Sequence, residues 1–295
     1  MTHRLNLTES APALKFAPQY LAEELGFFAA NDIAITGNID AGPAGSWLAD
    51  NLVSRAADIA LGGIWLPLVY KDLGIAELVP FAAVCHRNPA ILISRTPLTA
   101  PFSWSMLEGK RLLLSLAATS QWMFLEGVLQ EHDLDIDAIR IVRDLHVATT
   151  QSLWRNGLGD FFLVEPSLAF ALLDQGYAIA TTMAASGGPV PWSVYYTRPE
   201  LLEGDAPARR FGKAIDQALA WLLDPANAEE AADRLARRFA KTNPAHLRAV
   251  LDHFKTSRTW QTDTAIDAAA TARYQAMMVR YGLLNTTHEL AATAP

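Results

Sequence analysis

Short apolar runs alternate with amphipathic stretches over residues 5–200. Apolar runs bounded by turn residues are typical of strands, and amphipathic stretches are typical of helices, so the alternation predicts an α/β fold. Beyond Pro207 the pattern is helical as far as Leu284, with breaks at Pro225 and Pro244. The predicted strands are Leu5–Thr8, Asp32–Ile39, Asp58–Leu61, Arg111–Ser115, Ile139–Val142 and Asp160–Val164.

Two longer apolar runs interrupt this alternation. Leu78–Ser94 contains Pro80 and Pro89, and Ala178–Thr197 contains the break Gly187-Gly188-Pro189. Each run has room for two extended segments, one on each side of a crossing between domains. We therefore predict two lobes: residues 1–90 form the first part of lobe 1, residues 91–190 form lobe 2, and residues 191–295 return to lobe 1 and add the C-terminal helices.

A similar sequence pattern occurs once in each predicted lobe, and we call it the internal echo. Leu52–Ala60 and Leu153–Phe162 both read as a helix end, a turn, an aspartate and an apolar strand. The echo fits two similar α/β units. It also fits the ordinary use of glycine and aspartate where a helix turns into a strand, so the pattern leaves both interpretations open.

Composition removes several classes of function. The chain has 295 residues, with 24 Lys and Arg against 31 Asp and Glu, and a net charge of −7. This balance disfavours nucleic-acid partners, which need a basic face. Cys85 is the single cysteine, which excludes an intrachain disulfide and a cysteine-based metal cluster.

No secretory leader and no run of about 18 apolar residues is seen, so we expect no transmembrane segment. The expected location is cytoplasmic for the sequence as written, and periplasmic if a leader has been removed. The seven histidines lack metal-ligand spacing, and no dinucleotide or P-loop glycine motif occurs, so we expect neither a metal nor a cofactor.

Short motifs along most of the chain carry a resemblance to a known superfamily. They are Pro18–Ala22 with Gly26–Phe28, Ala57–Ala60, Leu107–Arg111, and Gly159-Asp160 before Val164–Pro166. In this order they resemble the type II periplasmic binding proteins, and in particular the group of sulfonate- and taurine-binding proteins and thiamine-pyrimidine synthases. The resemblance implies two α/β lobes with two crossing segments, a C-terminal helical extension on lobe 1, and a ligand in the cleft between the lobes.

The loops that follow the strands form the candidate ligand site, because α/β sheets bind ligands beyond the carboxyl ends of their strands. Tryptophan rings suit flat rings or cations, hydroxyl groups suit carboxylates and sulfonates, and a carboxylate accepts from ring or amine N–H groups. Core packing and helix capping are the competing roles for these side chains. The predicted ligand-binding residues are Glu9, Ser10, Ser46, Trp47, Gly62, Gly63, Trp65, His86, Ser115, Thr119, Ser120, Gln121, Trp122, Glu165 and Trp192.

The superfamily also contains enzymes, and their reactive residues are not matched. The lysine of the synthases falls on Gly62 and the histidine that follows it on Leu66, while the first-loop histidine falls on Phe16. The cysteine of the sulfinate desulfinases of this fold falls on Ser10. No catalytic residue is therefore assigned.

We interpret the chain as a small-molecule binding protein that resembles the substrate-binding component of an ABC importer. The expected ligand is a flat heterocycle, an aromatic acid or a small sulfonate, and the expected partner is an ABC permease. The alternative is a cytoplasmic enzyme on the same scaffold that acts on a small heterocycle or on an aromatic or chorismate-type acid. A ligand sensor is a third interpretation.

Overall fold

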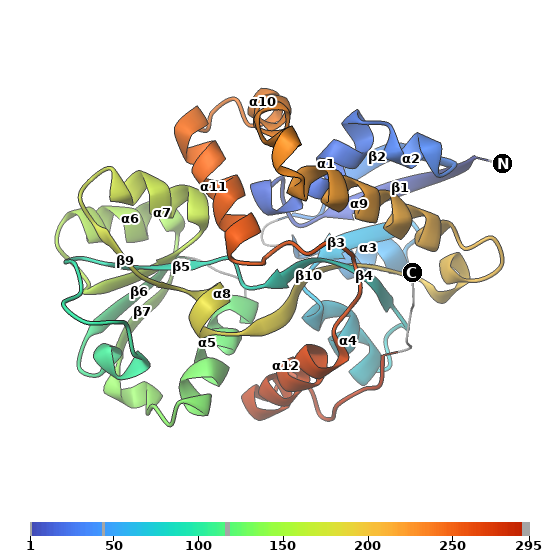
Figure 1. Cartoon of the computed structure of the whole chain (residues 1–295). Coiled ribbons are helices and arrows are strands. Elements are labelled where there is room, and N and C mark those ends of the chain that lie inside the picture. The colour runs from blue at the N-terminus through green and yellow to red at the C-terminus, as the bar shows by residue number, and fades with distance from the viewer. Residues whose placement is uncertain (1, 43–44, 116–118, 291–295) are drawn as a thin grey trace. The chain divides into compact units, whose positions relative to one another are not determined.

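Two five-stranded sheets, each with its own helices, make up the computed structural model (Figure 1). The structure describes residues 2–42, 45–115 and 119–290, with the backbone alone for Ser115 and Thr119. The chain divides into two units. Unit 1 consists of Met1–Arg87 and Pro189–Pro295, and unit 2 consists of Asn88–Gly188.

The sheet of unit 1 has the strand order β2-β1-β3-β10-β4. Its strands are β1 (His3–Glu9), β2 (Ile33–Asp40), β3 (Ile59–Gly62), β4 (Val79–Arg87) and β10 (Pro189–Thr197). Strand β1 runs parallel to β2 and β3, whereas β10 runs antiparallel to both β3 and β4. The carboxyl ends of β1–β4 and the amino end of β10 therefore share one edge of this sheet.

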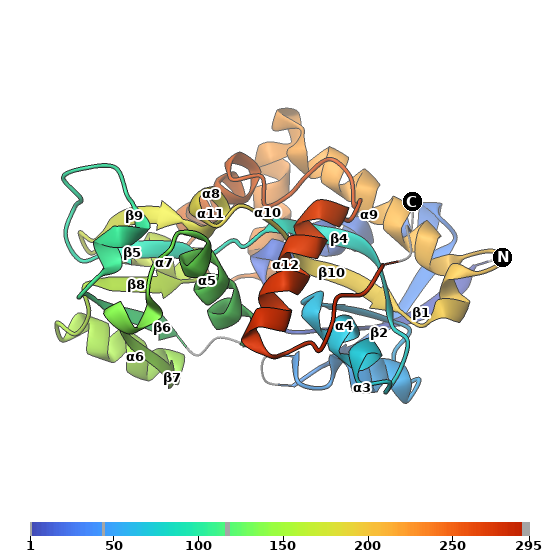
Figure 2. The same ribbon diagram turned by 90° about the horizontal axis from the view of Figure 1, so that it is seen from below.

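Helices cover both faces of the unit 1 sheet. Helices α1, α2 and α9 lie on one face, and α3 and α4 lie on the other, as the two views show (Figures 1 and 2). The helices are α1 (Ala17–Glu24), α2 (Phe27–Ala30), α3 (Leu48–Val53), α4 (Trp65–Asp72), α9 (Pro207–Leu223), α10 (Ala228–Arg238), α11 (Pro244–Thr256) and α12 (Ala268–Tyr281). Helix α9 is amphipathic: Phe211, Ile215, Leu219 and Leu222 are fully buried at helical spacing.

Unit 2 repeats the same sheet plan, with the strand order β7-β6-β8-β5-β9. Strands β6, β7 and β8 are parallel, and β5 runs antiparallel between β8 and β9. Its elements are β5 (Ile91–Ser94), β6 (Arg111–Ser115), β7 (Arg140–Leu145), β8 (Phe161–Val164), β9 (Ala178–Thr182), α5 (Thr119–Glu131), α6 (Val147–Arg155), α7 (Pro166–Leu173) and α8 (Met183–Ser186). Short 3-10 helices lie at Leu14–Phe16, Trp104–Leu107, Ile136–Ala138, Pro199–Leu202 and Pro225–Asn227.

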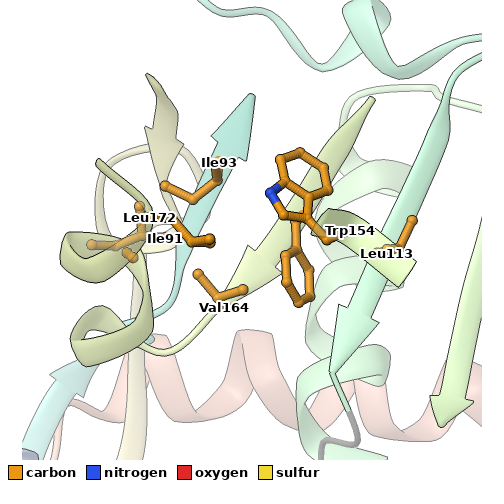
Figure 3. Packing of buried hydrophobic residues seen from close by; sticks show 8 residues of the cluster. Ile91, Ile93, Leu113, Trp154, Val164 and Leu172 are labelled. Carbon is orange, nitrogen blue, oxygen red and sulfur yellow. The ribbon is translucent and has the colours of Figure 1, made fainter. Parts of the chain in front are cut away.

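A cluster of buried apolar side chains forms the core of unit 2 (Figure 3). Leu172 points from α7 toward Ile91 on β5, with Val164 of β8 beside them. Trp154 of α6 is fully buried, and its ring lies 5.4 Å from that of Phe162. Burying an aromatic ring of this size contributes about 3 kcal/mol to stability.

The internal echo of the sequence is a structural repeat. The amide of Asp58 donates to the carbonyl of Asn6, and the Asn6 amide donates back to the Asp58 carboxylate, at 2.7 and 2.8 Å. Asp160 and Arg111 form the same reciprocal pair in unit 2, with both distances 2.8 Å. An aspartate thus fixes the entry to β3 in unit 1 and to β8 in unit 2.

An arginine completes the repeat in each unit. Arg198 follows β10 and donates to the carbonyls of Leu52 and Ala57 and to the Asp58 carboxylate. Arg95 follows β5 and donates to the carbonyls of Gly159, Trp154 and Leu158, with its guanidinium 3.9 Å from the centre of the Trp154 ring. Each arginine thus adds a charged donor to the carbonyls of the turn between a helix end, that of α3 or α6, and the strand that follows it.

The α/β fold class predicted from the sequence is confirmed: the protein has two mixed sheets with helices and a helical C-terminal region. One local prediction is wrong. The sequence pattern predicts a second helix over Ser46–Arg55 with Ser46 as its N-cap, but α3 begins at Leu48 after Trp47, and the Trp47 amide donates to the Ala41 carbonyl in a turn. The run Ala178–Thr197 contains two extended segments, β9 and β10, and between them the short helix α8, which begins where the Thr182 hydroxyl accepts from the Ala185 amide.

Replacing Arg95 tests the clamp at the end of β5. Arg95→Met should lower the free energy of unfolding by about 3 kcal/mol, because three carbonyls lose a charged donor and Trp154 loses its cation. Urea unfolding measures this change. The control is Arg140→Met, which alters an exposed arginine of β7 and should cost less than about 0.5 kcal/mol. Equal losses in the two variants would contradict the assignment.

A second test concerns the segment after α12. The Asp72 carboxylate accepts from the backbone amide and side chain of Asn285 at 2.9 and 2.8 Å, and contacts His288 Nε2 at 2.8 Å. The Asn285 amide in particular lowers the pKa of Asp72. A lowered pKa means that this attachment holds above the ordinary aspartate pKa of about 3.9 and weakens as the pH falls through the folded value.

The protection factors of the backbone amides over residues 284–290 should therefore fall in Asp72→Asn at neutral pH, and in the unmodified chain only on acidification. Asp50→Asn provides the control, because the Asp50 carboxylate accepts from Tyr70 and the structure gives it no bond to the C-terminal segment. Unchanged exchange in Asp72→Asn would show that this carboxylate does not hold the segment.

Candidate functional site

The carboxyl edge of the unit 1 sheet collects residues that the sequence placed in separate loops. Strand β1 ends at Glu9 and β3 ends at Gly62, while β10 begins at Pro189 and carries Trp192. The Ser10 amide donates to the carbonyl of Leu61 at 3.2 Å, which ties the loop after β1 to the end of β3. Glu9, Ser10, Gly62, Gly63, Trp65 and Trp192 therefore belong to one edge.

Glu9 is a buried carboxylic acid at this edge. Its side chain lies on the face of β1 that also buries Leu5 and Leu7, and the residue is 4% exposed. The Tyr20 hydroxyl donates to Glu9 Oε2 at 3.1 Å and the Gln19 amide donates at 3.2 Å. Burial raises the pKa of Glu9, and the hydrogen bond from Tyr20 and the charge of Arg238 offset part of the rise.

Tyr20 anchors this network. Its hydroxyl accepts from the Ala13 amide at 3.2 Å and donates to Glu9. The guanidinium of Arg238 stacks 3.9 Å from the centre of the Tyr20 ring. Burial and the neighbouring Glu9 raise the pKa of Tyr20, so its hydroxyl keeps its proton and remains a donor to Glu9.

Gly62 and Gly63 have a packing role at the end of β3. A Cβ on Gly62 would lie 2.5 Å from Leu48 Cδ1, and a Cβ on Gly63 would lie 2.5 Å from the ring of Trp65. Any larger residue would push these side chains away, so the glycines let both pack on the strand end. Trp65 itself is the first residue of α4 and is half-buried.

Two further predicted residues are buried in this unit. Trp192 is 8% exposed and His86 is 5% exposed. Burial lowers the pKa of His86, with the charge of Asp263 opposing the shift, so the ring is neutral at pH 7. Among the described residues, nothing bonds to His86 Nε2. A buried ring nitrogen without a partner is a costly feature for stability alone.

The loop after β2 carries Ser46 and Trp47 at the surface. Trp47 is 55% exposed, and its ring occupies the space where Gly42 would carry a side chain. Ser46 is exposed, and Ser10 is half-buried. Ser10 lies beside this loop, with its Cβ 3.1 Å from the Cβ position of Gly45.

In unit 2 the predicted residues gather at the carboxyl edge of the second sheet. Ser115 ends β6 and Thr119 begins α5, and both of their side chains lie outside the described part of the chain. Ser120 is half-buried and Gln121 is 8% exposed. Arg143 of β7 covers the ring of Trp122, with its guanidinium carbon 4.4 Å from the ring centre. That ring face is thereby occupied.

Glu165 takes the N-cap position of α7 with its backbone. Its carbonyl accepts from the amides of Leu168 and Ala169, while its side chain makes no capping bond and is exposed. The carboxylate thus stays available at the end of β8. That the carboxyl edges of the two units contact one ligand remains a prediction.

Sequence reasoning missed Gln19 and Tyr20, which hold Glu9, and Asn88. Asn88 is fully buried, with its Oδ1 accepting from the Ala90 amide at 3.0 Å and its Nδ2 without a partner among the described residues. A signal existed for Gln19: it is the one side-chain amide in the buried run Ala17–Ala22. A buried amide needs a partner, and that partner is Glu9.

No group of three metal-ligating side chains occurs within residues 2–42, 45–115 and 119–290. Over the same residues, no helix is both long and apolar enough to cross a membrane.

The repeated sheet plan and the carboxyl edges define a protein with the fold of the periplasmic binding proteins. Residues 13–228 match the family described as NMT1/THI5 like, and the chain belongs to this family. The superfamily resemblance predicted from the sequence motifs is thus confirmed.

Individual relatives are distant in sequence. A Bacillus subtilis protein named "Putative binding protein YtlA" is 24% identical over 286 residues, which are 95% of this chain and 84% of that protein. The periplasmic aliphatic sulphonate binding protein SsuA of Escherichia coli superposes with a TM-score of 0.75 and 16% identity, over 99% of this chain and 91% of that chain. The desulfurization enzyme DSZB superposes with a TM-score of 0.65 and 16% identity, over 98% of this chain and 95% of that chain.

The raised pKa of Glu9 gives stability a specific pH dependence. The folded state holds this proton more tightly than the unfolded state, so the contribution is full below the ordinary glutamate pKa of about 4.3 and is lost as the pH rises through the folded value. Glu9→Gln removes the dependence. The free energy of unfolding, measured in urea at pH 4 and pH 7, should therefore be compared between the unmodified chain and Glu9→Gln. The advantage of the unmodified chain should be larger at pH 4 than at pH 7. An equal difference at both pH values would contradict the raised pKa.

Proposed function

We propose that this protein binds a flat heterocycle with ring N–H groups and delivers it to an ABC permease. The observation that carries the proposal is Glu9, a buried carboxyl group at the end of β1 with its own fixed donors. The Asn38 side chain also forms a hydrogen bond to this carboxylate. A carboxylate has about four acceptor sites, so Glu9 can also accept from a ligand N–H donor.

The aromatic residues of the same edge support a flat ligand. Trp65 is half-buried at the start of α4, and Trp192 is buried at the start of β10. Offset stacking on such rings adds about 0.5–1.5 kcal/mol per contact beyond the burial of area. Membership of the NMT1/THI5-like family and the similarity to a named binding protein support binding as the activity.

Glu9 also discriminates between the ligand classes expected from the sequence. A sulfonate or carboxylate against an ionised Glu9 would meet like-charge repulsion in a poorly solvated place. A neutral ring with N–H donors has no such penalty. Unit 2 would contribute Ser120, Gln121 and Glu165, which adds amide, hydroxyl and carboxylate groups for the far side of the ring.

A thermal-shift screen tests the ligand class. Pyrimidines with ring N–H groups should raise the melting temperature more than aromatic acids or alkanesulfonates do. Glu9→Gln should weaken the best pyrimidine by about 10–100-fold, because a charged hydrogen bond contributes about 1.5–3 kcal/mol. Trp65→Ala should weaken it by about tenfold.

The matched control is Glu77→Gln, an exposed carboxylate of the same unit, which should leave the affinity unchanged. Unaltered affinity in both Glu9→Gln and Trp65→Ala would overturn the site. Stronger stabilisation by sulfonates would overturn the heterocycle.

An enzyme on the same scaffold is the second candidate. The observation that favours it is the raised pKa of Glu9, since perturbed acids are frequent in catalytic sites, and DSZB shows that the fold also occurs in an enzyme. The fate of the bound pyrimidine distinguishes a binding protein from an enzyme. A binding protein returns the bound pyrimidine unchanged after prolonged incubation with stoichiometric protein, and an enzyme returns a product detectable by mass spectrometry.

A further inference from the structure

A cavity of about 310 Å³ opens in unit 1 beside the edge strand β2. Its lining comes from β1, β2, α1, α2 and the last residue of α10. Glu9, Trp65 and Trp192 do not line it. Cavities of roughly 300–1,000 Å³ hold small ligands, so this one has the size of a binding site in its own right.

The walls of the cavity have three kinds of surface. Leu7, Phe28 and Ile35 give an apolar floor. Gln19 and Asn38 supply amide groups. Two opposite charges complete the lining: the carboxylate of Glu23 on α1 and the guanidinium of Arg238 at the end of α10.

The residues next to Glu23 and Arg238 form ion pairs with other side chains and not with these two charges. Glu24, next to Glu23, pairs with Arg234 and Arg237 at 3.6 and 3.5 Å. Within the described part of the chain, neither Glu23 nor Arg238 forms an ion pair, although both line the same cavity. A cavity lined by a positive and a negative side chain that do not pair with each other can bind a molecule that carries one charge of each sign.

Arg238 is held in place for such a role. Its guanidinium lies flat over the Tyr20 ring at 3.9 Å, and the Tyr20 hydroxyl is fixed by Glu9 and Ala13. A stacked guanidinium keeps its N–H groups directed outward in the plane, which is the geometry for two parallel bonds to a carboxylate.

We propose that this cavity is a second ligand site, and that it takes an α-amino acid with an apolar side chain. The ligand carboxylate pairs with Arg238 and the ammonium group pairs with Glu23. The side chain lies on Leu7, Phe28 and Ile35, and the amides of Gln19 and Asn38 complete the polar contacts. This cavity lies beside the carboxyl edge to which the proposed transport ligand binds: Glu9, Trp65 and Trp192 do not line it, but Gln19, which donates to Glu9, does.

Titration calorimetry with L-leucine on the full chain tests the site. L-Leucine should bind, and both 4-methylpentanoate, which lacks the ammonium group, and isopentylamine, which lacks the carboxylate, should bind at least about tenfold more weakly. Arg238→Gln and Glu23→Gln should each weaken L-leucine by about tenfold or more. The neighbouring substitutions Arg237→Gln and Glu24→Gln are matched controls and should change it by less than about twofold.

Thr36 also lines the cavity, so Thr36→Phe is a second variant that reduces its volume without removing a charge, and it should also abolish binding. Absence of L-leucine binding at about 10 mM would overturn the proposal, and so would equal binding of 4-methylpentanoate. Loss of L-leucine binding in Trp65→Ala would place the amino acid at the carboxyl edge and overturn the second site. Failure of the pyrimidine screen leaves these outcomes unaffected, so the two proposals fail separately.

Discussion

In each unit, a reciprocal pair of hydrogen bonds joins the aspartate before the central strand to the parallel strand beside it and fixes the geometry of the sheet. Asp58 with Asn6 and Asp160 with Arg111 set the register in which β3 and β8 lie beside their neighbours. Register decides which residues end at the carboxyl edge, because a slip of one position turns every side chain to the other face. The positions of Glu9 at one edge and Glu165 at the other depend on these bonds.

The strands of this repeat could be predicted from the sequence, whereas the contacts that complete it could not. Alternating apolar runs located the strands because each buried strand needs apolar residues on both faces, and the predicted Arg111–Ser115 is strand β6 itself. The echo became interpretable only with Arg198 and Arg95 in place. Both arginines lie far along the chain from the helix ends that they cap, so no local pattern connects them.

For the candidate site, the sequence predicted the positions of residues along the chain but not their partners in the fold. Periodicity placed Glu9, Gly62 and Trp65 on loops at strand ends, and the structure places them at one edge. It did not reveal that Trp122 lies under Arg143, because the partner of a ring is set by tertiary packing. Nor did it reveal that a tyrosine hydroxyl and an amide hold Glu9. Loop position follows from local sequence, whereas the chemistry of a buried acid follows from its non-local neighbours.

Tyr20 connects the two proposed ligand sites of unit 1 electrostatically. Its hydroxyl donates to Glu9 at the carboxyl edge, and its ring carries Arg238 at the cavity. The positive charge of Arg238 lowers the pKa of Glu9 against the rise due to burial. A carboxylate bound to Arg238 neutralises that charge, so occupancy of the cavity makes Glu9 hold its proton to higher pH. Because coupling between two sites is reciprocal, a ligand that needs ionised Glu9 and an amino acid in the cavity would each weaken the binding of the other.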